Sequence, residues 1–167
     1  MLLFNENYRR RAAVSYARRW AFGRNPAYYD YSALGGDCTN FVSQCVYAGC
    51  GVMNYTPDFG WYYISADDKA PAWTGVEFFY RFFTRAERSI GPVARLCEVE
   101  ELEAGDVVQI SFDGEIYAHT VLVVRTEKGE GADGIFIAAH TNDALDRPLN
   151  SYDYQALRCL HITGYWV

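Results

Sequence analysis

Three side chains of this sequence could together carry out nucleophilic chemistry on a carbonyl group: the thiol of Cys38 and the imidazoles of His119 and His140. A cysteine attacks as its thiolate, and an imidazole within reach can accept the thiol proton. In acyl transfer a third polar group usually orients that base. Such chemistry requires a fold that brings these three residues together.

Cys38 stands at the predicted start of a helix that runs to about residue 48, with Asp37 as its N-cap and Gly49 as its stop signal. Unpaired backbone N–H groups and the helix dipole favour the thiolate form of a cysteine at such a position. Many cysteines are simply small buried hydrophobes. The helix start, directly after the flexible pair Gly35-Gly36, favours a nucleophile instead.

The two histidines are predicted to lie on adjacent strands. His119 begins one strand and His140 ends the next, and the Gly-rich residues 126–134 between them have the composition of a hairpin loop. A hairpin centred in that loop would make the histidines cross-strand neighbours on one apolar face, as base and orienting residue. A zinc site of Cys38, His119 and His140 is the rival use of these atoms, but no closely spaced Cys or His pair nucleates it.

The elements that must position these residues are helices followed by strands. Apolar periodicity predicts helices over residues 5–21, with Asn5 or Asn7 as cap, over 38–48 and over 76–88. β-branched and aromatic runs predict strands over residues 107–112, 118–125, 135–139 and 160–166. This order indicates an α+β fold, with N-terminal helices packed on a C-terminal antiparallel sheet, in a single domain over residues 1–167. His161, on the last strand, is expected to be structural.

Composition and charge narrow the functional classes. The chain has 167 residues, half of them hydrophobic, and a formal charge of -6, which disfavours nucleic acids and anionic membrane surfaces as partners. Its five cysteines are an odd number, so at least one thiol should be free. No apolar run reaches the length of a membrane span and no export signal is evident. The chain as written is therefore expected to be cytoplasmic, or secreted if it is a domain of a longer protein.

Five strings of residues follow one another along the chain: Gly35-Gly36-Asp37-Cys38-Thr39-Asn40-Phe41-Val42-Ser43-Gln44, Gly60-Trp61-Tyr62-Tyr63, Leu102-Glu103-Ala104-Gly105-Asp106-Val107-Val108, Ala118-His119-Thr120-Val121 and His140-Thr141-Asn142-Asp143. In this order they resemble the Putative amidase domain family of the papain-like, NlpC-type cysteine peptidase superfamily. The resemblance spans residues 8–161, and the string from Asp37 to Gln44 is its most specific part.

The resemblance implies a papain-like core and a cysteine-dependent amidase or peptidase. It implies Cys38 as nucleophile, His119 as base and His140 as the third, orienting residue, a role that Asn142 or Asp143 could fill instead. Tyr31, or alternatively Tyr29, and Asp37 are the candidates for supporting the site. Since related enzymes cut peptide bonds of bacterial cell walls, a peptide or amide such as a peptidoglycan stem peptide is the expected substrate.

The residues also suggest how the reaction would proceed. The N–H of Cys38 and a loop donor would hold the oxyanion of an acyl-enzyme pathway, with no cofactor or metal required. The candidate pocket walls are Trp61, Tyr62, Tyr63 and the segment of residues 142–150. Within that segment Arg147 could meet a substrate carboxylate or belong to a plain surface turn closed by Pro148. An acyltransferase with the same triad, a non-catalytic module for cell-wall peptides, and an intracellular peptidase or deamidase of proteins are the alternatives.

Overall fold

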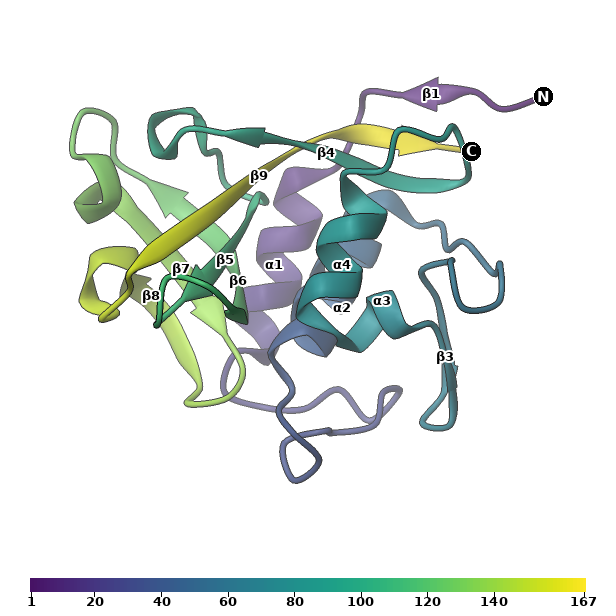
Figure 1. Ribbon diagram of the computed structural model, residues 1–167, viewed down its shortest axis with the longest axis horizontal. Coiled ribbons are helices and arrows are strands. Elements are labelled where there is room, and N and C mark those ends of the chain that lie inside the picture. Colours follow the sequence, from purple (N-terminus) through teal and green to yellow (C-terminus); the bar gives the residue numbers. More distant parts are fainter.

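The computed structural model describes residues 1–167 and places the N-terminal helices against one face of a curved antiparallel sheet (Figure 1). The helices are α1 (Arg10–Trp20), α2 (Cys38–Cys50), α3 (Pro71–Thr74) and α4 (Val76–Phe83). The strands of the large sheet are β1 (Phe4–Asn5), β4 (Gly91–Cys97), β5 (Val107–Ser111), β6 (Tyr117–Thr126), β7 (Ile135–Ala139), β8 (Ala144–Pro148) and β9 (Ala156–Trp166). The predicted α+β architecture is confirmed.

The sheet has the strand order β1-β9-β5-β6-β7-β8, and β4 pairs with β9 as well. The long strand β9, yellow in Figure 1, pairs with β1 and β4 and also with β5, so it joins these two strands to the antiparallel strands β5 to β8. A separate small hairpin is made of β2 (Tyr63–Ser65) and β3 (Asp68–Lys69). Short 3-10 turns complete the fold: η1 (Val99–Glu101), η2 (Gly131–Gly134) and η3 (Leu149–Ser151).

Each face of the sheet covers its own hydrophobic core. The helix-side core contains Phe41 of α2, Trp73 of α3 and Leu122 of β6 among its 22 buried residues. The opposite face covers a smaller core of 11 buried residues, which includes Val121 of β6 and Leu149 of η3. Because neighbouring residues of a strand point to opposite faces, Val121 and Leu122 belong to different cores. The same alternation decides where the histidines point.

The structure corrects the predicted ends of the helices. Asn5 belongs to β1 and its side chain accepts a hydrogen bond from the N–H of Asn7, so neither residue caps α1, which begins at Arg10. The helix α2 continues through Gly49, where a Cβ would lie 2.3 Å from the Tyr8 ring, and ends at Gly51 in the left-handed conformation. Gly49 thus serves close packing of α2 against the chain before α1, and Gly51 is the stop signal.

No helix has both the length and the apolar character needed to cross a membrane.

Candidate active site

Cys38 is the first residue of α2 and is 8% exposed. Asp37 occupies the N-cap position as predicted, but its side chain makes no capping hydrogen bond to the helix. The first helical backbone bond is the one that Phe41 donates to the carbonyl of Asp37, so the N–H groups of the first turn have no helical acceptor. The start of α2 therefore offers free N–H donors beside the Cys38 thiol.

The start of α2 is fastened to β6 by two threonine hydroxyls. The Oγ1 atoms of Thr39 and Thr120 lie 2.9 Å apart, and both residues are fully buried. Thr39 directly follows Cys38, and Thr120 directly follows His119. This hydrogen bond therefore holds the two predicted reacting residues on adjoining segments.

His119 lies on the second face of the sheet, opposite the helices. It pairs with Ile110 of β5, a member of the smaller core, and shares that face with Val121. Burial, with a smaller contribution from the charge of Arg147, lowers the pKa of His119 from 6.5 to about 4. The ring is therefore neutral at physiological pH, which is the form that can accept a thiol proton.

His140 lies on the helix side of the sheet and is 1% exposed. Its Nδ1 is 2.6 Å from Oδ2 of Asp37, its Nε2 is 2.8 Å from the carbonyl of Trp20, and its ring stacks on Phe41. Both ring nitrogens are thus engaged by groups other than His119. Asp37 is itself shared, because its Oδ1 accepts the backbone N–H of Tyr31.

The predicted cross-strand pairing of the two histidines is one residue out. Strands β6 and β7 pair Leu122 with Ala138, and continuing that register places Thr120, not His119, opposite His140. An extra residue in β6, between Val123 and Arg125, and the turn η2 in the loop set this register. A shift of one residue moves a side chain to the other face, so the two imidazoles lie on opposite sides of the sheet.

A cavity of about 470 Å³ opens beside His119. The other residues that line it are Phe112, Ala118, Thr141, Asn142, Arg147, Ser151, Tyr152 and Asp153. Two of its walls border the start of α2. The Thr141 hydroxyl accepts the backbone N–H of Asp37 at 3.1 Å, and Tyr152 is close enough to Cys38 for the thiolate charge to affect its pKa.

Tyr152, which the sequence analysis did not select, lies in this cavity next to both His119 and Arg147. Its ring is 5.7 Å from that of His119, and the Arg147 guanidinium lies 3.6 Å over it. Burial raises the pKa of Tyr152; the Arg147 guanidinium opposes the rise, both by its charge and by its closeness to the hydroxyl, and Cys38 adds to the rise. The Tyr152 hydroxyl and Nε of Arg24 are the buried side-chain polar atoms without a hydrogen bond. The one sequence hint is that Tyr152 lies just beyond Arg147 and Pro148, which end strand β8 and do not form the surface turn that was the alternative for them.

The turn between β7 and β8 holds two of the cavity walls in an unusual conformation. Thr141 has φ 64° and Asn142 has φ 55°, and neither is glycine. A β-branched residue with positive φ is strained, and such strain often marks a functional site. Asn142 makes no side-chain hydrogen bond, so its amide is free to turn toward His119. Asp143 points elsewhere and forms an ion pair with Arg24.

The other predicted site residues do not line the cavity. Tyr31 donates its hydroxyl to the carbonyl of Ala66, and the N–H of Tyr29 bonds to the Tyr63 hydroxyl. Trp61 is completely buried in the helix-side core, where its indole N–H donates to Ser43. Tyr62 is buried against Tyr55. Of the candidate pocket walls, Asn142 and Arg147 of the segment 142–150 line the cavity beside His119, and Trp61, Tyr62 and Tyr63 do not.

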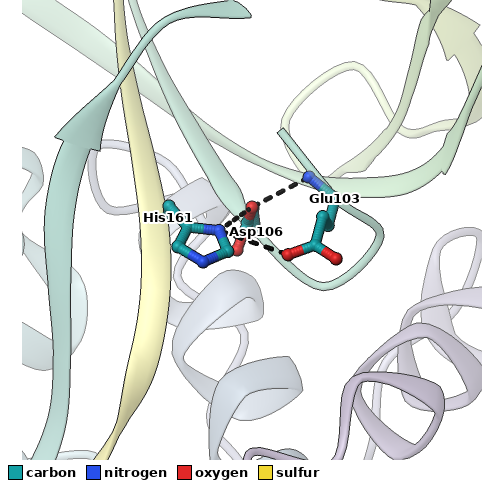
Figure 2. Close-up of side chains that lie close together, drawn as sticks. All are labelled: Glu103, Asp106 and His161. Carbon is teal, nitrogen blue, oxygen red and sulfur yellow. Dashed lines mark hydrogen bonds and ion pairs between the residues drawn. The ribbon is translucent and has the colours of Figure 1, made fainter. Parts of the chain in front are cut away.

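A second cluster of titratable groups, Glu103, Asp106 and His161, has the spacing of metal ligands (Figure 2). Asp106 is fully buried, and its carboxylate accepts from Arg10, from the N–H groups of Glu103 and Ile162, and from Nδ1 of His161. Its lone pairs are thus occupied by protein donors, including a guanidinium that would repel a cation. The cluster instead binds α1, the turn before β5 and β9 together, in agreement with the structural role predicted for His161.

Comparison with known proteins adds to this geometry. A family model described as "Putative amidase domain" matches residues 7–163. The "Uncharacterized protein YhbB" of Bacillus subtilis (strain 168) is 34% identical over 125 residues, which cover 73% of this chain and 39% of the relative. The chain therefore matches well under half of the relative's length. No solved structure matches.

Proposed function

This chain belongs to the Putative amidase domain family, and from that premise we propose that it is a cysteine-dependent hydrolase of amide bonds with Cys38 as nucleophile and His119 as base. Family membership by itself supports amide hydrolysis and an amide substrate. The residues, the cysteine mechanism and the papain-like assignment are our proposal. Its main support is the hydrogen bond between Thr39 and Thr120, which fastens the residues next to Cys38 and His119 to each other.

In the proposed reaction His119 accepts the proton of the Cys38 thiol, and the sulfur attacks the carbonyl carbon of the amide. The neutral state of His119 supports this role, because an imidazolium could not accept the proton. His119 then protonates the leaving amine as the tetrahedral intermediate collapses to a thioester. Water, deprotonated by the same imidazole, hydrolyses the thioester and restores the thiol.

Two donors are proposed to stabilise the oxyanion of the tetrahedral intermediate. One is the backbone N–H of Cys38, which has no helical acceptor. The other is the Tyr152 hydroxyl, which is buried without a partner and lies near both Cys38 and His119. An unpaired buried hydroxyl is costly in the resting protein, and an oxyanion would supply the acceptor that it lacks.

We propose Asn142 as the residue that orients His119. The resemblance implied His140 for this role, but both of its ring nitrogens are engaged on the helix side of the sheet. Asn142 lines the same cavity as His119 and has a free amide. In this proposal His140 is a positioning residue, which holds Asp37 and with it the start of α2.

The proposed substrate class is a peptide or related amide, and bacterial cell-wall stem peptides are the candidates that the family resemblance implies. An acyltransferase would use the same residues and pass the acyl group to an acceptor other than water. Product analysis with an added amine would separate the two activities.

The direct test is the pH dependence of the rate at which iodoacetamide alkylates Cys38 in the folded protein, with the modified site identified by peptide mass. An activated pair should give reaction well below the ordinary thiol pKa of about 8.5 and lose it in a His119→Ala variant. The other four cysteines are internal controls, since burial raises the pKa of Cys45 and Cys50 and of Cys97 and Cys159. A Cys38 that reacts no faster at neutral pH than an ordinary thiol, with or without His119, would contradict the proposal and favour a binding module.

A further inference from the structure

The cavity beside His119 contains one cationic side chain, Arg147 of β8. Arg147 pairs with Ile137, a member of the smaller core, which places it on the same face of the sheet as His119. Its Nε donates to the Ser151 hydroxyl at 2.8 Å and its Nη2 to the Ser151 carbonyl at 3.4 Å. The guanidinium also lies flat over the Tyr152 ring. The charge is therefore held in place before any ligand arrives.

Nothing in the protein neutralises this charge. The Nη1 atom of Arg147 has no hydrogen-bond acceptor, and the guanidinium forms no ion pair, although Asp153 lines the same cavity. The neighbouring Asp146 on β8 instead pairs with Arg18 and Arg125. A half-buried, preorganised guanidinium without a counter-ion is suited to bind a carboxylate.

We propose that Arg147 binds a carboxylate of the substrate, so that this protein acts on amides that carry a free carboxylate close to the bond that is cut. This inference rests on the proposed function, because it takes the cavity beside His119 to be the substrate site. It selects acidic peptides and N-acylated amino acids over neutral amides. The rival reading is that Arg147 only packs on Tyr152.

The charge of Arg147 also bears on the base. It is one of the causes that lower the pKa of His119 to about 4, after burial. A carboxylate bound to Arg147 would offset that charge and make His119 a stronger base. A substrate with a carboxylate would thus be favoured both in binding and in proton transfer.

The test compares two alkylating reagents that react in the same way and differ in charge, iodoacetate and iodoacetamide. The ratio of their rates at Cys38 is measured in the wild type and in Arg147→Gln, Arg147→Lys and Arg125→Gln. Arg125 is the matched control, because its guanidinium also lies over an aromatic ring, that of Phe136, outside the cavity. Arg147→Gln should lower the iodoacetate to iodoacetamide ratio about tenfold, roughly the effect of one charge contact at a partly exposed site. Arg147→Lys should lower it less and Arg125→Gln should leave it unchanged.

A ratio that is the same in wild type and Arg147→Gln would overturn the carboxylate site and leave the hydrolase proposal standing. Slow alkylation by both reagents in the wild type would count against the hydrolase proposal instead. The ratio would still decide the role of Arg147 in that case, because both rates are measured on the same thiol. The iodoacetamide rate also reports whether each variant keeps a native site.

Discussion

The hydroxyl groups of Thr39 and Thr120 form a buried hydrogen bond between the start of α2 and strand β6, 2.9 Å from oxygen to oxygen. Each threonine is adjacent in sequence to one member of the proposed reacting pair. The Thr120 hydroxyl is also 3.3 Å from the Gln109 amide, so it keeps one partner if Thr39 is changed. The pair thus joins two segments that lie 81 residues apart in the chain.

Thr39→Val should therefore affect the chemistry more than the stability. Valine has the shape of threonine, but it loses the hydrogen bond to Thr120 and the 3.7 Å contact from the Thr39 hydroxyl to the Cys38 sulfur. Because Thr120 keeps Gln109 as a partner, the loss should cost about 1 kcal/mol. A small displacement of Cys38 relative to His119 should lower its alkylation rate at neutral pH about tenfold. The control is Thr163→Val. It removes a hydroxyl of β9 that donates a hydrogen bond to the Val93 carbonyl of β4. Equal effects of the two variants on alkylation would show that the contact does not position Cys38.

Tyr152→Phe should lower the activity without lowering the stability, whereas most substitutions of buried residues destabilise the protein. It removes a hydroxyl that has no partner in the folded protein, so the free energy of unfolding should stay the same or rise by about 1 kcal/mol. If the hydroxyl donates to the oxyanion, kcat on an amide substrate should fall about 100-fold. Urea unfolding and steady-state kinetics on the same preparation test both expectations. An unchanged kcat would remove Tyr152 from the proposed mechanism.

The arrangement of the fold was predictable because local signals agree with it. Apolar periodicity located α1, α2 and α4, and β-branched and aromatic runs located β5, β6, β7 and most of β9, in the order that an α+β fold requires. The sequence did not reveal the short strands β1, β2 and β3, nor β4 and β8. The last two lack that pattern: β4 carries Pro92 and Arg95, and β8 carries Asp146 and Arg147. They become strands because β4 pairs with β9 and β8 pairs with β7, and such tertiary contacts cannot be predicted from the β-propensity of the residues.

The site was predictable only as far as single positions allow. Cys38 at the start of α2 follows from a local helix signal. The relation between His119 and His140 depends on the register of a hairpin whose loop contains η2 and whose strand β6 contains a bulge, and sequence spacing does not determine either feature. Tyr152 reaches the site only because η3 folds over the second face of the sheet, which no local pattern predicts.

His140 and Asn142 offer a paired prediction about the third residue. His140→Ala would leave the buried Asp37 carboxylate without its nearest partner, and breaking such a pair should cost about 3 kcal/mol of stability. Asn142→Ala removes an exposed side chain without a hydrogen bond, so the free energy of unfolding should change by less than about 0.5 kcal/mol. Asn142→Ala should lower kcat about tenfold and shift the pH–rate profile while the fold stays intact, whereas any loss of kcat in His140→Ala should accompany its loss of stability.

The comparison between these two variants is informative in both directions. If His140→Gln keeps the stability of the wild type but has a different pH–rate profile, His140 is the orienting residue. Its imidazole would then have to leave Asp37 during the reaction. If Asn142→Ala has wild-type kinetics, the proposed role of Asn142 is wrong. Circular dichroism and urea unfolding of both variants accompany the kinetics, so that loss of activity by unfolding is recognised.

His119 should make the protein less stable in acid, in a defined range of pH. Its pKa is 6.5 in the unfolded chain and about 4 in the folded protein, so between these values the unfolded state binds the proton and the folded state does not. Stability therefore falls as the pH decreases from about 6.5 to about 4, by up to about 3 kcal/mol from this residue.

The variant His119→Asn tests this expectation, because asparagine cannot titrate in this range and should remove that part of the slope. Other groups of the chain also contribute to acid unfolding, which is why the difference between wild type and His119→Asn is the quantity to measure. Arg147→Gln should shrink the same difference, because losing the nearby cation raises the folded pKa of His119 toward its unfolded value. Parallel stability curves for wild type and His119→Asn would mean that His119 is not the buried neutral base that the proposed mechanism needs.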